Sequence, residues 1–582
     1  MNTEMRVCQN CQKDFKIESE DFSFYEKMGV PAPAWCPHCR FIRRMMFINQ
    51  RSLYKRTCGH CAASIISMYN GDVSLPVWCV KCYLSDAWDA RDYGRDYDFS
   101  RNFFEQYKEL KYSIPHRALD QNERNGEGCE YSNLCYGSKD VYLSFYTVRS
   151  ENLKYCSCSI RGNKNCLDSM IIKENEKGYE LVQSTKNYNS TFLVESEQCI
   201  DSHFLFDCIN CVNCCLSSNL RNKSYMFKNK QLFREDYEEA VALLHLETYS
   251  GQSQTKEIFR EITQKAIYKH AHIKNSINAV GDFVINSKNV FQCCGVSKAE
   301  NVKYAFFAFN TMKDSQDLIF TGKVEECYES TLAGRGGNKL IFSLGCGGGS
   351  TNLFYCDSCR GCSDCFGCVG LSQKQYCVFN KQYEEKEYFE FVDKIKKHIS
   401  DMPYVDGKGR KYPFGESFPA ELSPFAYNES SAFEEMPLTK EEVISLGYKW
   451  RDPESKSYIP TITSDQIPDS VLDVSDEITK DIIECPNKGK VESQCTSAYR
   501  ILPDELAFYK QMNLPIPRYC PNCRYHARLK WKNPFRFYDR ECMCELSNHA
   551  HKEKCQNKFE TMYSPERPEV IYCKECYQKE VY

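Results

Sequence analysis

The middle of the chain carries a short pattern of polar and apolar positions that recurs from about residue 128. A polar residue precedes an apolar one and the two kinds then alternate, as in Asp140-Val141-Tyr142-Leu143 and Asn165-Cys166-Leu167-Asp168. The unit returns at about every twelfth position, and the pattern resumes at Asn289-Val290. Such alternation predicts short strands whose inward side chains stack on those of neighbouring coils. We therefore expect a mainly β fold with a parallel, β-solenoid-like core, in which two units (about 24 residues) form one turn.

The repeats fall into two blocks, 128–230 and 276–382, which end alike. Each closes on an FxNKQ-like segment and is followed by a helical pattern, in 231–275 and 383–400. The second of these helices has one apolar face, and a further helix is predicted near residues 255–272. We expect these helices to cap the open ends of the blocks and to prevent edge-to-edge pairing.

Residues 401–480 differ from both blocks because they are acidic, polar and contain proline. A short helix is predicted from Thr439, where Glu442 completes a capping box and Gly447 ends the helix. The pattern favours a linker with local structure.

The two ends of the chain are copies of one module, over residues 1–100 and 483–582. Cysteines of the two copies differ in number by 484, and after a ten-residue insertion they differ by 494, as in Cys58/Cys542 and Cys61/Cys555. The copies therefore share one register, interrupted by a single inserted loop.

The N-terminal copy contains two CxxC…CxxC sets at a spacing typical of structural zinc, and the C-terminal copy carries corresponding cysteines. Four thiolates fill a tetrahedron around Zn²⁺ and leave no position for a reactive water. We expect zinc ribbons, in which hairpins bring the CxxC turns together, and about four zinc ions per chain. The N-terminal ligands are Cys8, Cys11, Cys36 and Cys39, followed by Cys58, Cys61, Cys79 and Cys82.

The ligand set of the C-terminal copy is less regular. Glu492 stands where the counterpart of Cys8 is expected, so Cys485 is predicted to supply that ligand. Cys542 is the register-matched ligand of the last group, but Cys544 in the inserted loop could replace it. His549 and His551 share that loop, where exposed histidines are favoured over ligands. The remaining predicted ligands are Cys495, Cys520, Cys523, Cys555, Cys573 and Cys576.

Basic residues with interleaved aromatics lie between the CxxC motifs of each copy. Phosphates attract such charge and bases stack on aromatic rings, so these connectors are candidate nucleic-acid contacts. The alternative is a solvated linker whose aromatics pack the module together. The candidate residues are Arg40, Arg43, Arg44, Arg51, Lys55 and Arg56 in the first copy and Arg524, Arg528, Lys530, Trp531, Lys532 and Arg536 in the second.

Twenty further cysteines lie in the repeat blocks, and five of them run at every third position from Cys356 to Cys368. One interpretation is an additional metal or iron–sulfur site. Because other repeats place Val, Leu or Tyr at the same step, packing of small apolar side chains in a narrow interior is favoured.

Composition, charge and the absence of common catalytic motifs narrow the range of possible functions. The chain has 582 residues and 37 cysteines, and its net charge of −4 gives no global field toward nucleic acid or membranes. We see no signal peptide and no apolar run of membrane-spanning length, so a cytoplasmic protein with reduced thiols is expected. The sequence contains no HExxH, GxSxG or GK[ST] motif, and no small-molecule substrate is evident.

Several stretches resemble a family of uncharacterised cysteine-rich zinc-ribbon proteins from bacteria of the Candidate Phyla Radiation. The resemblance is carried by FPAELSPFAYNESSAFEEMPLTKEEVISLGYKW, GCVGLSQKQYCVFNKQYEEKEYFEF and LPIPRYCPNC…YSPERPEVIYCKECYQKEVY and covers most of the chain. Members can carry a CoA-transferase-like (caib/baif) label, for which we find no supporting motif. The resemblance implies zinc and a cytoplasmic location but no settled activity.

Three functions are compatible with these patterns. A zinc-binding, non-catalytic scaffold with an unknown protein partner is favoured. Nucleic-acid binding through the basic connectors is the alternative, and a redox or iron–sulfur enzyme is the third.

Overall fold

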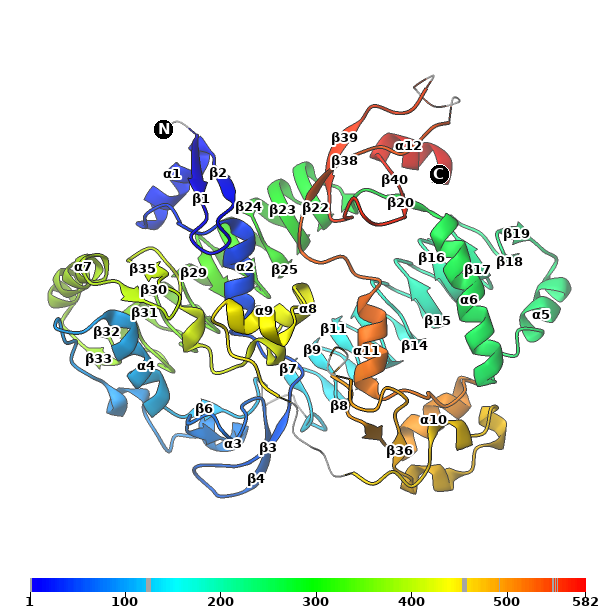
Figure 1. The fold of residues 1–582 in the computed structure, drawn as a ribbon, viewed down its shortest axis with the longest axis horizontal. Coiled ribbons are helices and arrows are strands. Elements are labelled where there is room, and N and C mark those ends of the chain that lie inside the picture. The colour runs from blue at the N-terminus through cyan, green and yellow to red at the C-terminus, as the bar shows by residue number, and fades with distance from the viewer. Residues whose placement is uncertain are drawn as a thin grey trace.

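Two stacks of short parallel strands form the centre of the computed structural model, and a cysteine-rich module lies at each end of the chain (Figure 1). The structure describes residues 3–121, 127–452, 458–490, 492, 494–546, 549, 551 and 553–582. A few residues of the expected terminal modules, and 453–457 of the expected linker, therefore lie outside the description. None of the described helices is long and apolar enough to cross a membrane.

The first stack contains twelve short strands. They are β7 (Asn133–Tyr136), β8 (Lys139–Tyr142), β9 (Phe145–Val148), β10 (Glu151–Lys154), β11 (Ser157–Ile160), β12 (Lys164–Leu167), β13 (Met170–Ile172), β14 (Glu176–Tyr179), β15 (Tyr188–Val194), β16 (His203–Phe206), β17 (Cys215–Ser218) and β18 (Met226–Phe227). The second stack contains β21 (Ile273–Lys274), β22 (Ile277–Ile285), β23 (Lys288–Ser297), β24 (Ala299–Lys303), β25 (Phe306–Ala308), β26 (Met312–Ile319), β27 (Val324–Glu325), β28 (Tyr328–Thr331), β29 (Gly337–Ile341), β30 (Thr351–Phe354), β31 (Ser363–Phe366) and β32 (Gln375–Val378).

Paired strands in each stack are separated along the chain by a single repeat unit. Leu193 pairs in parallel with Leu205, one unit later, and Leu205 pairs with Ser217 after one more unit. The same step relates Leu353 to Cys365 in the second stack. The chain therefore returns above itself once per repeat unit, and the prediction that two units form one turn is wrong by a factor of two.

The short turn follows from a left-handed backbone at nearly every third residue. Asp140, Leu143, Tyr146, Arg149 and Asn152 have φ between 42° and 54°, and this spacing continues through both stacks. Each such residue redirects the chain, so four of them bring it back to the strand below. Side chains other than Gly adopt this conformation at a cost of about 1 kcal/mol or more, which the hydrogen bonds between successive coils offset.

The residue after each left-handed position points into the narrow interior. Cys356, Cys359, Cys362, Cys365 and Cys368 occupy five such positions in succession and are buried. The thiol of Cys356 donates to the carbonyls of Phe354 (3.4 Å) and Cys365 (3.5 Å), and burial raises the pKa of the Cys359 thiol well above its usual range. These cysteines serve as small interior side chains, as the packing interpretation predicts.

The helices cover sides as well as ends of the stacks. Antiparallel pairing with β19 (Lys230–Gln231) and β33 (Lys381–Gln382) ends the two stacks, and α5 (Arg234–Ala242) and α7 (Glu385–Asp401) follow. Helix α6 (Tyr249–Lys265) instead lies along β16 and β17 and packs Phe259 against Phe204. It ends earlier than predicted because residues 267–269 form strand β20 (Ile267–Lys269).

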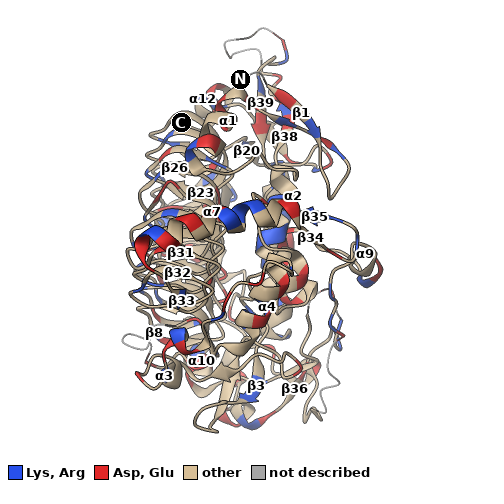
Figure 2. Cartoon of the chain, turned by 90° about the vertical axis from the view of Figure 1, so that its left-hand side faces the viewer, with Lys and Arg blue, Asp and Glu red and all other residues tan. Residues whose placement is uncertain are grey.

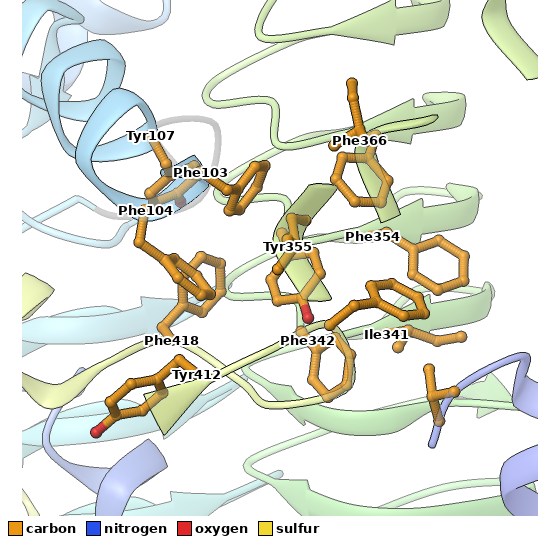
Figure 3. Packing of buried hydrophobic residues seen from close by; sticks show 14 of the residues in the cluster. Phe103, Phe104, Tyr107, Ile341, Phe342, Phe354, Tyr355, Phe366, Tyr412 and Phe418 are labelled. Carbon is orange, nitrogen blue, oxygen red and sulfur yellow. The ribbon is translucent and has the colours of Figure 1, made fainter. Parts of the chain in front are cut away.

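Helix α4 (Phe103–Ser113) covers one side of the second stack (Figure 3). Phe103 lies against Phe366 and Tyr355, and Tyr107 packs on Phe418. Phe418 comes from residues 401–480, which also form β34 (Tyr404–Val405), β35 (Lys411–Tyr412), α8 (Ala432–Glu435) and α9 (Lys440–Ser445). Much of this segment is buried, so its described part belongs to the core and is not a simple linker. The predicted capping box of Thr439 and Glu442 is present.

His272 connects the two stacks through two carboxylates. Its Nε2 lies 3.3 Å from Glu195 of the first stack, and its Nδ1 lies 2.9 Å from Asp282 of β22. Burial disfavours protonation, but the charges of Asp282 and Glu195 outweigh it and raise the pKa of His272 well above its usual value. The imidazolium thus neutralises two acids that face each other.

This contact predicts that stability falls as the pH rises above about 6.5. The pKa of His272 is higher in the folded state than in the unfolded state, so the contact stabilises the fold fully at pH values below the unfolded-state pKa. That stabilisation is lost as His272 deprotonates at higher pH. We expect the melting temperature to fall more between about pH 6.5 and 9 in the natural protein than in a His272→Asn variant. Equal pH profiles of the two proteins in thermal melts would contradict the assignment.

Candidate metal centres

Four groups of four cysteines bring their sulfur atoms together in the terminal modules. The groups are Cys8, Cys11, Cys36 and Cys39; Cys58, Cys61, Cys79 and Cys82; Cys485, Cys495, Cys520 and Cys523; and Cys542, Cys555, Cys573 and Cys576. Sulfur pairs such as Cys11–Cys36 (3.9 Å), Cys485–Cys523 (3.8 Å) and Cys555–Cys573 (4.0 Å) have the separation of about 3.8 Å that tetrahedral Zn–S bonds of about 2.3 Å require. All 37 cysteines are free thiols. The described residues therefore fit tetrahedral metal ions.

Each group combines the turn of a hairpin with the first turn of a helix. The first cysteine pair follows one strand of an antiparallel hairpin, and the second pair begins a helix at its N-cap residue. The hairpins are β1 (Glu4–Val7) with β2 (Asp14–Ile17), β3 (Tyr54–Thr57) with β4 (Ser64–Ser67), β36 (Ile483–Glu484) with β37 (Ala498–Tyr499), and β38 (Tyr538–Glu541) with β39 (Lys558–Thr561). The helices are α2 (Pro37–Met45), α3 (Val80–Tyr83), α11 (Pro521–Leu529) and α12 (Lys574–Val581). The expected hairpin is thus present at the first cysteine pair of each group, and the second pair lies at the start of a helix.

The backbone stabilises negative charge on these sulfurs. The amide of Cys36 donates to the Cys8 sulfur (3.2 Å), and the amide of Cys79 donates to Cys58 (3.2 Å). At Cys58 burial raises the pKa, but hydrogen bonds from the amides of Cys61 and Cys79 outweigh it and lower the pKa to about 6. The start of a helix adds a favourable dipole for thiolates.

The same hydrogen bonds identify the ligands of the C-terminal copy. Cys520 donates its amide to the Cys485 sulfur (3.4 Å), and Cys573 donates to Cys542 (3.2 Å). Cys485 therefore takes the place of Cys8 in its group, as predicted, and Cys542 takes that of Cys58. Cys544 does not replace Cys542 but lies in a fifth group, with His549, His551 and Cys576. The expectation of exposed loop histidines is wrong for His549, whose side chain is 1% exposed.

The arginines of α2 point into the protein and contact the second stack. Arg40, Arg43 and Arg44 are each 1% exposed. The Asp317 carboxylate accepts hydrogen bonds from Arg40 (2.7 Å) and Arg44 (2.9 Å), and Glu329 accepts from Arg43 (2.9 Å). The charges of Glu329 and of Glu416 outweigh the burial of Arg43 and raise its pKa. These three candidate nucleic-acid contacts therefore lie inside the protein and not on its surface.

The C-terminal module repeats this contact on the first stack. Asp168 lies 3.1 Å from Arg524 and 3.0 Å from Arg528, and Glu180 lies 3.2 Å from Arg528. Arg524 and Arg528 follow Arg40 and Arg44 by 484 in the numbering, and Asp168 and Glu180 precede Asp317 and Glu329 by 149. The N-terminal module therefore contacts the C-terminal stack and the C-terminal module the N-terminal stack. Sequence analysis missed these acids, although their constant spacing between the blocks is a detectable signal.

The second half of each module meets the entrance of the other stack. Strand β5 (Val77–Trp78) pairs in parallel with β6 (His116–Arg117), from which the chain enters the first stack. Strand β40 (Val570–Tyr572) pairs in the same way with β20, before the second stack. Each module thus bridges both stacks.

The other predicted nucleic-acid contacts divide into packed and exposed residues. Arg51 lies 3.5 Å from the centre of the Tyr525 ring, Lys532 pairs with Glu435, and Trp531 packs near Phe259. Half-buried Arg56 donates to the carbonyl of Asn70, whereas Lys55, Lys530 and Arg536 are exposed. Figure 2 shows Lys and Arg mixed with Asp and Glu on the face in view, as along α7. The connectors therefore act mainly within the protein.

No protein-family model matches the chain, nor does a curated protein or a solved structure.

Proposed function

We propose that this protein is a zinc-binding, non-catalytic scaffold. In it, structural zinc ions, each held by four cysteines, support two modules that clamp two β-solenoid blocks together. The observation that carries the proposal is the position of the second CxxC pair in the first half of each module, at the start of α2 and α11. Zinc bound there fixes the helix whose arginines reach the acids of the stack.

Closed coordination supports a structural role for the ions. Four thiolates leave no position for water or substrate, whereas catalytic zinc keeps one open. The need for thiolate ligands favours the reducing cytoplasm. We propose a protein as the partner, because most candidate phosphate-binding side chains are used in internal packing.

Metal analysis of full-length, anaerobically purified protein tests this proposal. We expect at least four zinc ions per chain and little iron, because the four groups supply sixteen thiolates. Cys11→Ser is expected to remove one ion, while Cys158→Ser, which changes a buried stack cysteine outside the groups, leaves the count unchanged. Two or fewer zinc ions in the natural protein would contradict the scaffold, and stoichiometric iron would favour a redox protein.

A further inference from the structure

The inserted loop of the C-terminal module gathers metal-binding side chains beside an existing group. Its ten additional residues separate Cys542 from Cys555, whose N-terminal counterparts Cys58 and Cys61 form an ordinary CxxC. The insertion does not disturb the four-cysteine group, because Cys542 and Cys555 still meet Cys573 and Cys576. The loop therefore adds ligands without removing any.

Four donor atoms converge at this loop. Those of Cys544, His549, His551 and Cys576 all lie within 4.8 Å of one another. The Cys544 sulfur is 3.1 Å from Nδ1 of His549, and the Cys576 sulfur is 3.3 Å from Nε2 of His551. Two thiolates and two imidazoles at such separations form a set typical of tetrahedral zinc.

The second nitrogen of each histidine has an oxygen partner. Nε2 of His549 is 2.8 Å from the Glu580 carboxylate, which leaves Nδ1 free to coordinate. Nδ1 of His551 faces the carbonyl of Glu553, which leaves Nε2 directed at Cys576. Metal-bound histidines commonly donate their other N–H to a carboxylate or carbonyl, which fixes the tautomer and orients the ring. This second observation indicates that the rings are positioned as ligands.

Cys576 belongs to both groups, and this shared thiolate defines the arrangement. We propose that the loop binds a fifth zinc ion through Cys544, His549, His551 and Cys576, with the Cys576 sulfur bridging it to the ion held by Cys542, Cys555 and Cys573. Five thiolates and two neutral imidazoles around two divalent ions leave one net negative charge, against two for a lone four-thiolate site. The bridge thereby reduces the charge buried at this end of the protein. The inference rests on the proposed function, because the neighbouring group must hold zinc.

The N-terminal module supplies matched controls for the test. It has no insertion, and in the part of the chain that the structure describes Cys82, the counterpart of Cys576, belongs to one group only. His60 lies between Cys58 and Cys61, is exposed and belongs to no group among the described residues.

The experiment counts zinc in full-length, anaerobically purified protein by native mass spectrometry and elemental analysis. We expect five ions in the natural protein, four in a His549→Ala/His551→Ala variant and five in His60→Ala. Cys576→Ser is expected to remove two ions, whereas Cys82→Ser removes one.

The outcomes separate this inference from the proposed function. Four ions in both the natural protein and the double histidine variant would overturn the fifth site and leave the scaffold intact. Two or fewer ions in the natural protein would overturn both. Loss of a single ion in Cys576→Ser, with one lost also in the histidine variant, would overturn the bridge. Where Cys576→Ser does not fold, the histidine variant still decides the fifth site, and zinc X-ray absorption on the natural protein decides the bridge. A zinc–zinc distance detected in that spectrum supports the shared Cys576 sulfur, and its absence overturns the bridge.

Discussion

Full-length protein stripped of metal by a strong chelator under reducing conditions is expected to lose hydrogen-exchange protection in both terminal modules. Their hairpin strands are short, as in β1 and β36, and bury little apolar surface of their own. Structural zinc supplies about 10–16 kcal/mol of apparent binding energy in small metal domains. This is comparable to the net stability of about 5–15 kcal/mol that whole domains possess. Loss of the proposed zinc ions should therefore release α2 and α11, and with them the arginines that contact the stacks.

Mass-resolved hydrogen exchange before and after chelation measures this effect. A matched pair of variants serves as the control: Cys36→Ser removes a ligand, and Cys158→Ser removes a buried thiol of the first stack. Only Cys36→Ser should deprotect residues 4–17 and 37–45 without chelator. Modules that remain protected after complete removal of zinc would show that the metal does not stabilise them.

Replacing the aspartates that pair with the arginines of α2 and α11 is expected to have the second largest effect on stability. Asp317 is buried and accepts hydrogen bonds from Arg40 and Arg44, and Asp168 lies in the same way against Arg524 and Arg528. Asp317→Asn removes a negative charge that compensates the buried guanidinium groups of Arg40 and Arg44. Breaking a buried ion pair from one side costs about 3–5 kcal/mol. Asn also tolerates the left-handed backbone at both positions (φ 58° and 49°), so the loss would reflect charge and not strain.

Urea denaturation of Asp317→Asn and Asp168→Asn quantifies the loss, and hydrogen exchange locates it. Asp314→Asn is the control, because Asp314 also has a left-handed backbone but pairs with Lys27 near the surface. A surface pair contributes about 0–1 kcal/mol. Asp317→Asn should deprotect α2, and Asp168→Asn should deprotect α11. Stability losses no larger than that of Asp314→Asn would mean that apolar packing alone holds the modules.

The repeated contacts indicate that the chain consists of two related halves that exchange their partners. Besides the acids, Tyr155 and Tyr304 occupy equivalent positions of the two stacks, and each faces the equivalent arginine, Arg524 and Arg40. Each module also pairs with the strand that leads into the other stack. Both modules therefore contribute to covering each stack. The two halves are therefore expected to unfold together. Urea denaturation of the Asp317→Asn and Asp168→Asn variants also tests this expectation.

Features that depend on local spacing could be predicted from the order of residues. The CxxC pairs located the cysteine groups, because two thiolates within one turn of chain can reach one ion. Where a longer loop separates the first pair, as between Cys485 and Cys495, the register shared with the other copy identified the group. Alternation at the repeat spacing located both stacks, and Cys356 to Cys368 proved to be interior positions. The length of a coil was missed, because the left-handed conformation that shortens the turn is adopted by residues of many types, such as Asp140, Leu143 and Arg149, and no single residue type marks it.

Which surfaces meet became known only from the folded chain. A stretch such as Arg40 to Arg44 has the same composition whether it faces phosphate, water or buried acids, and Asp317 lies 273 residues beyond Arg44. The fifth group likewise joins Cys544, His549 and His551 of one loop to Cys576 of a helix that follows it. Burial and ion pairing depend on complementary groups that folding brings together from distant parts of the chain. The local sequence pattern does not specify which of these groups come into contact.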